Sequence, residues 1–300
     1  MIPTFYSDKM VVDELNSYSP SAGKPRIVAH ALHDLQRTMP KLGIKFYEPE
    51  PVSIESICRV HDESHVRSIL ALSKNDGFEK KNANVARSLP YTSGAMLSAA
   101  RFALHARTHA AALCSGFHHA SYDVAKWFCT FNGLMISAAE LLHTGEARRI
   151  AIIDADQHYG DGTQSILDDA KRGKIPGLQP ETCDRIFHYS FGQDFEEPAH
   201  ARLYLARARE LGDELAKFSP DVVIYQAGAD AHCDDPLGGV LTTEELVDRD
   251  MTIIGACTKL GIPVAWNLAG GYKRDVSGGI SGVVKIHTNT FFAAWLKSLQ

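Results

Sequence analysis

The stretch Val222-Val-Ile-Tyr-Gln226-Ala-Gly-Ala-Asp230 decides the fold class of this 300-residue chain. Its first residues are apolar without the alternation of a half-exposed strand, which is the pattern of a strand covered on both faces. An aspartate follows within four residues. A second apolar run, Arg149–Asp154, is also followed by acidic residues. We therefore interpret both runs as buried strands with polar side chains at their carboxyl ends.

Strand-like and helix-like segments alternate along the whole chain. This alternation predicts a single α/β domain over residues 1–300, with three α/β/α layers around a mainly parallel sheet. Thr242 and Glu245 form a capping box at the start of one predicted helix. The predicted strands are Ile44–Tyr47, Ala110–Cys114, Arg149–Asp154, Arg185–Tyr189, Val222–Gln226 and Pro263–Leu268, and the predicted helices are Arg26–Arg37, Gly94–Ala106, Gly133–His143, Arg202–Lys217, Glu244–Lys259 and Thr290–Leu299.

The composition is that of a soluble globular protein, with 45% hydrophobic and 22% charged residues. A formal net charge of -5 gives no reason to expect nucleic acid or an anionic membrane as a partner. The six cysteines lie far apart without a CxxC pair, so we expect reduced thiols in a cytoplasmic protein. We see no signal peptide and no apolar stretch near the roughly 18 residues of a membrane span. The oligomeric state stays open.

Three residues after the predicted strands could bind one divalent metal ion. Asp156 and His158 are two positions apart in an extended segment, so their side chains point to the same side. Asp230 can supply a third ligand, which leaves one position open, as in catalytic sites. This donor set suits Zn²⁺, but it is hard enough that Fe²⁺, Co²⁺ or Mn²⁺ stays open. The alternative, in which Asp154 and Asp156 only cap a helix, is disfavoured by the other polar residues at neighbouring strand ends.

Two adjacent histidines, His118 and His119, follow another predicted strand on a loop that contains Gly116. Such a pair suggests proton transfer, with Asp154 and Asp161 as the carboxylates that would set the tautomer of each ring. The two rings would titrate as a coupled pair.

Gly270-Gly271-Tyr272 follows the strand predicted at Pro263–Leu268. The glycines allow a backbone conformation that places the phenol, and a phenol is a good donor to a developing oxyanion. In parallel α/β sheets, ligands bind beyond the carboxyl ends of the strands, where His118, Asp154, Asp230 and Tyr272 would all lie. We therefore expect these residues to form one site.

Together these pieces resemble the metal-dependent histone deacetylase / acetylpolyamine amidohydrolase family, and most of all its short, class IV-like branch. The family has an arginase-like α/β fold. The resemblance runs from about Pro25 to Tyr272. It rests on five motifs in order: Ser115-Gly-Phe-His118-His119-Ala, Phe128-Cys-Thr-Phe-Asn132, Asp154-Ala-Asp-Gln-His-Tyr-Gly-Asp-Gly162, Ala229-Asp-Ala-His-Cys-Asp-Asp-Pro-Leu-Gly239 and Ala269-Gly-Gly-Tyr272.

The resemblance implies a zinc-dependent deacylase that uses metal-activated water to hydrolyse the amide bond of an acylated amine, such as an acyl-lysine or an acetylpolyamine-like molecule. Asp156, His158 and Asp230 would be the zinc ligands. His119, with Asp161 as its partner, would act as the general base. His118, paired with Asp154, would be its electrostatic partner, and Tyr272 would stabilise the oxyanion.

The family also carries a structural monovalent cation, usually K⁺, near the zinc ion. The resemblance implies that Asp154, Asp156, His158, Ser190 and the Phe191 backbone hold that cation here. Phe128 would form one wall of the tunnel that receives the acylated side chain.

Three departures from the family pattern concern the surroundings of the site. Trp127 stands where the family has glycine, Tyr159 where it often has histidine, and the Ser190–Asp230 segment is shorter than usual. Trp127 would either line the substrate entrance or fill space left by the missing loop. We expect a reshaped mouth that favours a slim or small acylated amine over a folded histone tail.

Two other functions stay open at this point. The first is a binuclear manganese ureohydrolase on the same fold, which would need further bridging carboxylates where this chain has Gln157. The second is a non-catalytic protein that keeps the pocket to bind acylated partners.

Overall fold

The chain forms one seven-stranded, all-parallel sheet, which confirms the predicted α/β class. The structure, a computed structural model, describes residues 1–12, 15, 17–195 and 200–299. The strand order is β2-β1-β3-β7-β6-β4-β5. The strands are β1 (Ile2–Phe5), β2 (Ile44–Tyr47), β3 (Ala110–Ala112), β4 (Ile150–Asp154), β5 (Ile186–Ser190), β6 (Val222–Gln226) and β7 (Val264–Asn267).

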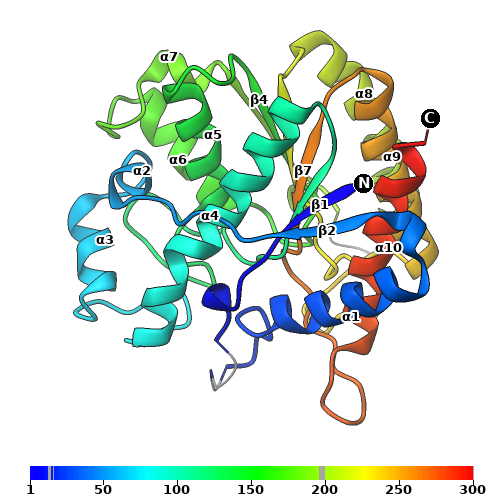
Figure 1. Ribbon diagram of the computed structural model, residues 1–300. Helices are drawn as coiled ribbons and strands as arrows, with labels where there is room; N and C mark the ends of the chain where they lie inside the picture. The colour runs from blue at the N-terminus through cyan, green and yellow to red at the C-terminus, as the bar shows by residue number, and fades with distance from the viewer. Residues whose placement is uncertain (13–14, 16, 196–199, 300) are drawn as a thin grey trace.

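Helices cover both faces of this sheet and make the three layers that the sequence predicts (Figure 1). One layer contains α2–α7, and the other contains α1 and α8–α10. The helices are α1 (Lys24–Thr38), α2 (Ile54–Cys58), α3 (Glu63–Leu70), α4 (Ala83–Ala106), α5 (Gly133–His143), α6 (Asp161–Lys171), α7 (Pro180–Cys183), α8 (Ala201–Phe218), α9 (Thr243–Lys259) and α10 (Ser281–Lys297), with short 3-10 turns at Asp8–Met10, Pro40–Leu42 and Phe191–Gln193.

The central strands are buried on both faces, as their lack of alternation predicts. In β4, Ile150 and Ile152 pack against the layer of α2–α7, whereas Ala151 and Ile153 pack against the opposite layer. Burying a side chain of this size stabilises the fold by roughly 1.5–3 kcal/mol. Two apolar cores therefore hold the sheet between the helices, and the strand ends keep a fixed spacing.

Most predicted elements are present, and several boundaries agree to within a residue or two. The capping box of α9 is confirmed, because the Thr242 side chain accepts a hydrogen bond from the Glu245 amide and the Glu245 carboxylate accepts one from the Thr242 amide. Within the described residues, no helix has both the length and the hydrophobicity needed to cross a bilayer.

Three differences from the prediction have local causes. Strand β1 was not predicted, because it has four residues and includes Pro3. Helix α4 begins at Ala83, well before the predicted Gly94. The helix continues through Pro90, a residue type that normally interrupts a helix, and the prediction therefore began after it. Helix α10 begins at Ser281 rather than at the predicted Thr290. The prediction missed its first turn, because that turn contains glycine and two valines, which are weak helix formers.

His109 is a buried histidine that joins helix α9 to strand β7. Its Nδ1 accepts a hydrogen bond from the Val264 amide at 3.1 Å, and its Nε2 lies 2.9 Å from Thr258 Oγ1. This pattern requires a neutral ring. Burial lowers the pKa of His109 to about 4.

The depressed pKa of His109 predicts a loss of stability in mild acid. The unfolded chain takes up a proton near pH 6.5 and the folded chain only near pH 4, so folding weakens as the pH falls through this window. We expect His109 to account for roughly 3 kcal/mol of the unfolding free energy lost between these limits. Urea unfolding of wild type and His109→Asn at several pH values measures this contribution.

The variant should show a shallower dependence of the unfolding free energy on pH. His30→Asn, at an exposed position of α1, is the control and should keep the wild-type dependence. Equal slopes for wild type and His109→Asn would contradict the assignment.

Candidate metal centre

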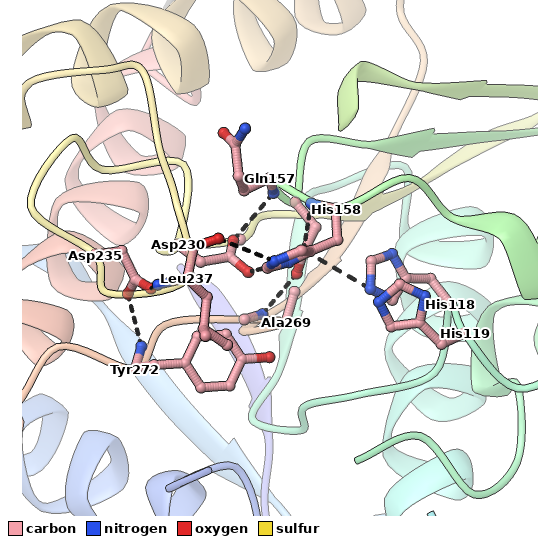
Figure 2. Close-up of polar contacts among 12 residues, drawn as sticks. His118, His119, Gln157, His158, Asp230, Asp235, Leu237, Ala269 and Tyr272 are labelled. Atoms are coloured by element: carbon pink, nitrogen blue, oxygen red, sulfur yellow. Dashed lines mark hydrogen bonds and ion pairs between the residues drawn. The ribbon is translucent and has the colours of Figure 1, made fainter. Parts of the chain in front are cut away.

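The three predicted metal ligands lie together at the carboxyl ends of β4 and β6. These two strands are neighbours, with Asp154 paired to Gln226 in register. The chain that leaves β4 carries Asp156 and His158, and the loop after β6 carries Asp230. One ligand atom from each of these three residues lies within 4.8 Å of the other two. Figure 2 shows His158 and Asp230 side by side in this group. The structure thus brings together residues that are 74 positions apart at most.

The geometry of these three side chains fits a divalent cation. His158 Nδ1 lies 3.2 Å from Asp156 Oδ1 and 3.3 Å from Asp230 Oδ2. Both carboxylates are buried, and burial followed by the charge of Asp156 raises the pKa of Asp230 to about 7. Asp230 Oδ2 accepts no hydrogen bond from the described residues. Two buried carboxylates that face one another need a positive charge between them, and the donor set of oxygens and imidazole nitrogen supplies its ligands.

Glycine is required at position 270, where the backbone passes over the carboxylates. The Gly270 amide donates a hydrogen bond to Asp156 Oδ2 at 2.8 Å. A Cβ atom there would collide with Asp230 Oδ2 and lie 2.7 Å from Asp156 Oδ2. The first part of the Gly-Gly-Tyr motif is therefore needed for close approach of the backbone to the candidate ligands.

The adjacent histidines form two separate carboxylate pairs. His118 Nδ1 lies 2.8 Å from Asp154 Oδ2, and His119 Nδ1 lies 2.7 Å from Asp161 Oδ1, as the sequence predicts. The two rings are 4.0 Å apart between centroids. Both side chains point toward the candidate ligands from the same loop (Figure 2).

The surroundings separate the pKa values of these two rings. Burial favours the neutral form of His118, but the charges of Asp154 and Asp156 outweigh it and raise the pKa to about 9. Burial and the nearby charge of His118 lower the pKa of His119 to about 4. Near neutral pH, the pair therefore consists of a protonated His118 and a neutral His119. Titratable neighbours with separated pKa values are a mark of acid–base sites.

Asp161 has a second partner that the sequence analysis missed. Lys126 Nζ lies 2.5 Å from Asp161 Oδ2, while His119 takes the other oxygen. Burial would raise the pKa of Asp161, but the hydrogen bonds from His119 and Lys126 lower it to about 2. The carboxylate is thus charged and fixed in orientation at Nδ1 of His119.

Tyr272 lies beside the candidate metal ligands. Its ring lies 6.4 Å from that of His158 and 5.9 Å from that of Phe128, between centroids. The backbone that carries it is fixed by Asp235, whose Oδ2 accepts hydrogen bonds from the amides of Tyr272 and Lys273 at 2.7 and 3.2 Å. Burial and the charges of the nearby aspartates raise the pKa of Tyr272 well above its usual value, so the phenol keeps its proton.

Two buried cations from distant helices support the loops of this centre, and the sequence analysis missed both. Arg249 of α9 donates from Nη1 to the carbonyl oxygens of Ala155 at 3.0 Å and Gly228 at 2.8 Å. It thereby joins the loop after β4 to the loop after β6. Lys24 of α1 donates to the carbonyls of Ala269 and Gly270, beside Tyr272.

Ser190 and Phe191 lie next to the candidate centre at the end of β5. Ser190 pairs with Asp154 in register, and its Oγ accepts a hydrogen bond from the Gly160 amide at 3.0 Å. Phe191 is fully buried. The structure thus brings Asp154, Ser190 and Phe191 together beside Asp156 and His158, as the proposed cation site requires.

Phe128, Trp127 and Tyr159 lie at the opening above the centre. All three line one cleft of about 820 Å³ that also contains His119, His158 and Tyr272. The two predicted substrate-binding residues, Phe128 and Trp127, therefore share one cleft with His119, Asp161 and Tyr272 of the predicted catalytic residues.

A second cluster of metal-binding residue types, His232, Cys233 and Asp234, lies on the surface. Its polar atoms have protein partners, because His232 Nε2 lies 3.0 Å from Thr243 Oγ1 and Asp234 forms an ion pair with Lys273. Of the two clusters found among the described residues, the group of Asp156, His158 and Asp230 is the one that combines metal-binding geometry with two buried carboxylates.

Comparison with known proteins gives a family match over most of the chain. Residues 21–191 and 196–287 match the histone deacetylase domain. A probable deacetylase of Methanothermobacter thermautotrophicus is 25% identical over 281 residues, which cover 86% of this chain and 82% of the relative. An acetylpolyamine amidohydrolase of Burkholderia pseudomallei is 28% identical over 236 residues, which cover 72% of this chain and 67% of the relative.

Some relatives are considerably longer than the region they share with this chain. Two of them, at 30% and 28% identity, are covered over 55% of their length, so the chain spans about half of each. In fold, the chain is similar to the crystal structure of the HDA15 HD domain, with a TM-score of 0.76 at 18% identity over 100% of this chain and 89% of that one.

The geometry predicts that Asp156 and Asp230 are each required for metal binding. Asp156→Ala or Asp230→Ala removes one of three ligands. Changing a residue that only supports a ligand lowers metal affinity by roughly 10–100-fold. We therefore expect the loss of a ligand to lower the affinity for Zn²⁺ by more than that. Metal analysis after dialysis and calorimetric titration with Zn²⁺ measure the loss.

Asp234→Asn, in the exposed cluster, is the matched control and should bind Zn²⁺ like wild type. Circular dichroism checks that each variant is folded. Wild-type retention of zinc in both Asp156→Ala and Asp230→Ala would overturn the ligand assignment.

Proposed function

The chain belongs to the histone deacetylase family, and from this premise we propose that it is a metal-dependent deacylase, which hydrolyses the amide bond of an acylated amine. An acyl-lysine or an acetylpolyamine-like molecule is the proposed class of substrate. The observation that carries the proposal is the buried Asp156, His158 and Asp230 group beside two carboxylate-paired histidines. The relatives described as a probable deacetylase and an acetylpolyamine amidohydrolase support the same class of reaction.

In this proposal, Asp156, His158 and Asp230 would hold Zn²⁺, with Fe²⁺ or Co²⁺ as other candidates for this donor set. The bound ion would supply Lewis acidity toward the substrate carbonyl and the attacking water. Asp154, Asp156, His158, Ser190 and the Phe191 backbone would hold a structural K⁺ ion next to it. The register pairing of Asp154 with Ser190 supports this second assignment.

The separated pKa values of the two histidines support different roles in proton transfer. His119, which is neutral near pH 7, would accept a proton from the attacking water through Nε2, because its Nδ1 faces Asp161. His118, which is protonated and faces Asp154, would provide positive charge beside the reacting group. The fixed charge of Asp161 would stabilise the proton once it is on His119.

Tyr272 would donate its phenolic hydrogen to the oxyanion that forms from the substrate carbonyl. Burial and the nearby aspartates raise its pKa well above the usual value, which favours the protonated donor. Asp235 fixes the backbone of this residue, so the donor is in place before the substrate binds. Phe128, whose ring lies beside that of Tyr272 in the same cleft, would pack against the acyl-bearing chain.

A binuclear ureohydrolase fits this geometry less well. Such a site needs additional bridging carboxylates, but position 157 is Gln, and its side-chain amide donates to the carbonyl of Phe195 at 2.9 Å. Asp154 is already paired with His118. A non-catalytic binder would not need the ordered pairs of His119 with Asp161 and His118 with Asp154. We therefore favour hydrolysis at a single divalent ion.

The proposal predicts that Tyr272→Phe impairs catalysis without loss of metal. Removing one donor to the oxyanion should lower turnover of an acetyl-lysine peptide by about 10²–10³-fold. The measurement is a fluorogenic deacetylation assay with zinc content determined on the same samples. A chelator should abolish wild-type activity, and added Zn²⁺ should restore it.

Tyr6→Phe is a matched control, because this tyrosine donates to Asp8 Oδ1 and does not line the cleft. Near-normal turnover in Tyr272→Phe would contradict the role of the phenol. If wild type with full zinc content hydrolyses neither acyl-lysine peptides nor acetylpolyamines, the proposed function is wrong.

A further inference from the structure

Trp127 lies in a strained turn at the entrance of the cleft. Its φ angle is +48°, and that of Phe128 is +65°, so two successive non-glycine residues are in the left-handed region. Lys126 and Cys129 exchange backbone hydrogen bonds of 3.0 and 2.9 Å across the turn, and the Phe128 amide donates to the Gly77 carbonyl at 2.7 Å. Each left-handed residue costs roughly 1–2 kcal/mol, so the surrounding structure holds an unfavourable conformation in place.

Packing of Trp127 into the protein does not offset this cost. The residue is 59% exposed to solvent, although an indole normally contributes to stability through burial. Of the two roles that the sequence left open, the structure therefore favours the entrance rather than a filler for missing loop volume. Strain that is not offset by packing is typical of functional positions.

Two contacts hold the indole in this exposed position. Lys126 Nζ lies 4.4 Å from the centre of the ring, and the same ammonium forms the ion pair with Asp161. The ring also meets His119 edge to face, with 4.8 Å between centroids. The indole is thus oriented by the residues that flank the proposed base, and its face on one side is taken by a cation.

Two further apolar side chains lie on the rim of the same cleft. Tyr18 is 57% exposed and stacks on Tyr272 with 6.4 Å between centroids, and Leu237 is 38% exposed. With Trp127, they form what we call the apolar rim. The cleft volume of about 820 Å³ is near the upper end of the range for small-molecule sites, so the cleft has room for more than a slim acylated amine.

Resting on the proposed function, we infer that the apolar rim binds an apolar or aromatic group carried by the amine part of the substrate, next to the scissile amide. Exposed aromatic and aliphatic side chains around a roomy cleft favour burial against such a group. Lys126 already occupies one face of the Trp127 ring, so the indole has less surface left for a second cation. The preferred substrate class is therefore an acyl-lysine with a neutral, aromatic or apolar neighbour rather than a polycationic acetylpolyamine.

The test compares three acetylated substrates on the zinc-loaded 300-residue chain. Two acetyl-lysine peptides differ only at the residue next to the acetyl-lysine, which is phenylalanine or glycine, and the third substrate is acetylputrescine. Wild type should show a kcat/KM for the phenylalanine peptide that is roughly fivefold to tenfold above that for the glycine peptide. Acetylputrescine should be the poorest substrate.

Variants at the rim should reduce this preference. Trp127→Gly keeps the left-handed turn accessible and should lower the phenylalanine-to-glycine ratio to below about twofold. Trp127→Phe should retain most of the ratio, because an aromatic ring remains. Leu203→Ala, at an equally exposed position (59%) on α8 that does not line the cleft, is the matched control and should keep the wild-type ratio.

Two results would overturn the inference while leaving the proposed function intact. One is an equal loss on all three substrates in Trp127→Gly, and the other is a wild-type preference for acetylputrescine. If no substrate is hydrolysed, the proposed function fails, and peptide binding still tests the rim. Fluorescence anisotropy with the Tyr272→Phe protein should then show tighter binding of the phenylalanine peptide, and equal affinity for both peptides would overturn the inference.

Discussion

The concentration of buried negative charge at the ends of β4 and β6 is the constraint on which the rest of the site depends. Asp154, Asp156 and Asp230 are all buried at neighbouring strand ends. Buried charges are costly unless they are paired, so each carboxylate needs positive charge or hydrogen-bond donors close by. His118 serves Asp154, the Gly270 amide serves Asp156, and a divalent ion would serve Asp156 and Asp230 together.

The sheet brings these charges together, and two buried cations keep the loops in place. Arg249 joins the carbonyls of Ala155 and Gly228, which lie one and two residues before candidate ligands on different loops. Its own charge is balanced by Asp250, which also accepts hydrogen bonds from Tyr225 and Thr290 at 2.6 Å. The spacing of the candidate ligands is therefore set by a network that reaches from the loops into helices α9 and α10.

The sequence predicted features that depend on neighbouring residues, but not contacts between residues that only the fold brings together. Strand β6 and the pairs of His118 with Asp154 and His119 with Asp161 could be predicted, since an unbroken apolar run and a motif with fixed spacing carry them. Lys24 and Arg249 could not be predicted as support for the site, because a charged residue in a helix normally faces solvent. The role of Trp127 also needed the structure, since its exposure separates an entrance residue from a packing residue.

The number of divalent ions bound per chain tests this account most directly. The structure offers one buried group of ligands within the described residues, with Asp154 and Gln157 engaged elsewhere. We predict that apo protein titrated with Zn²⁺ or Mn²⁺, with metal content measured after removal of excess ion, saturates at one tightly held divalent ion per chain. Two tightly held ions per chain would contradict the mononuclear centre and favour the binuclear alternative.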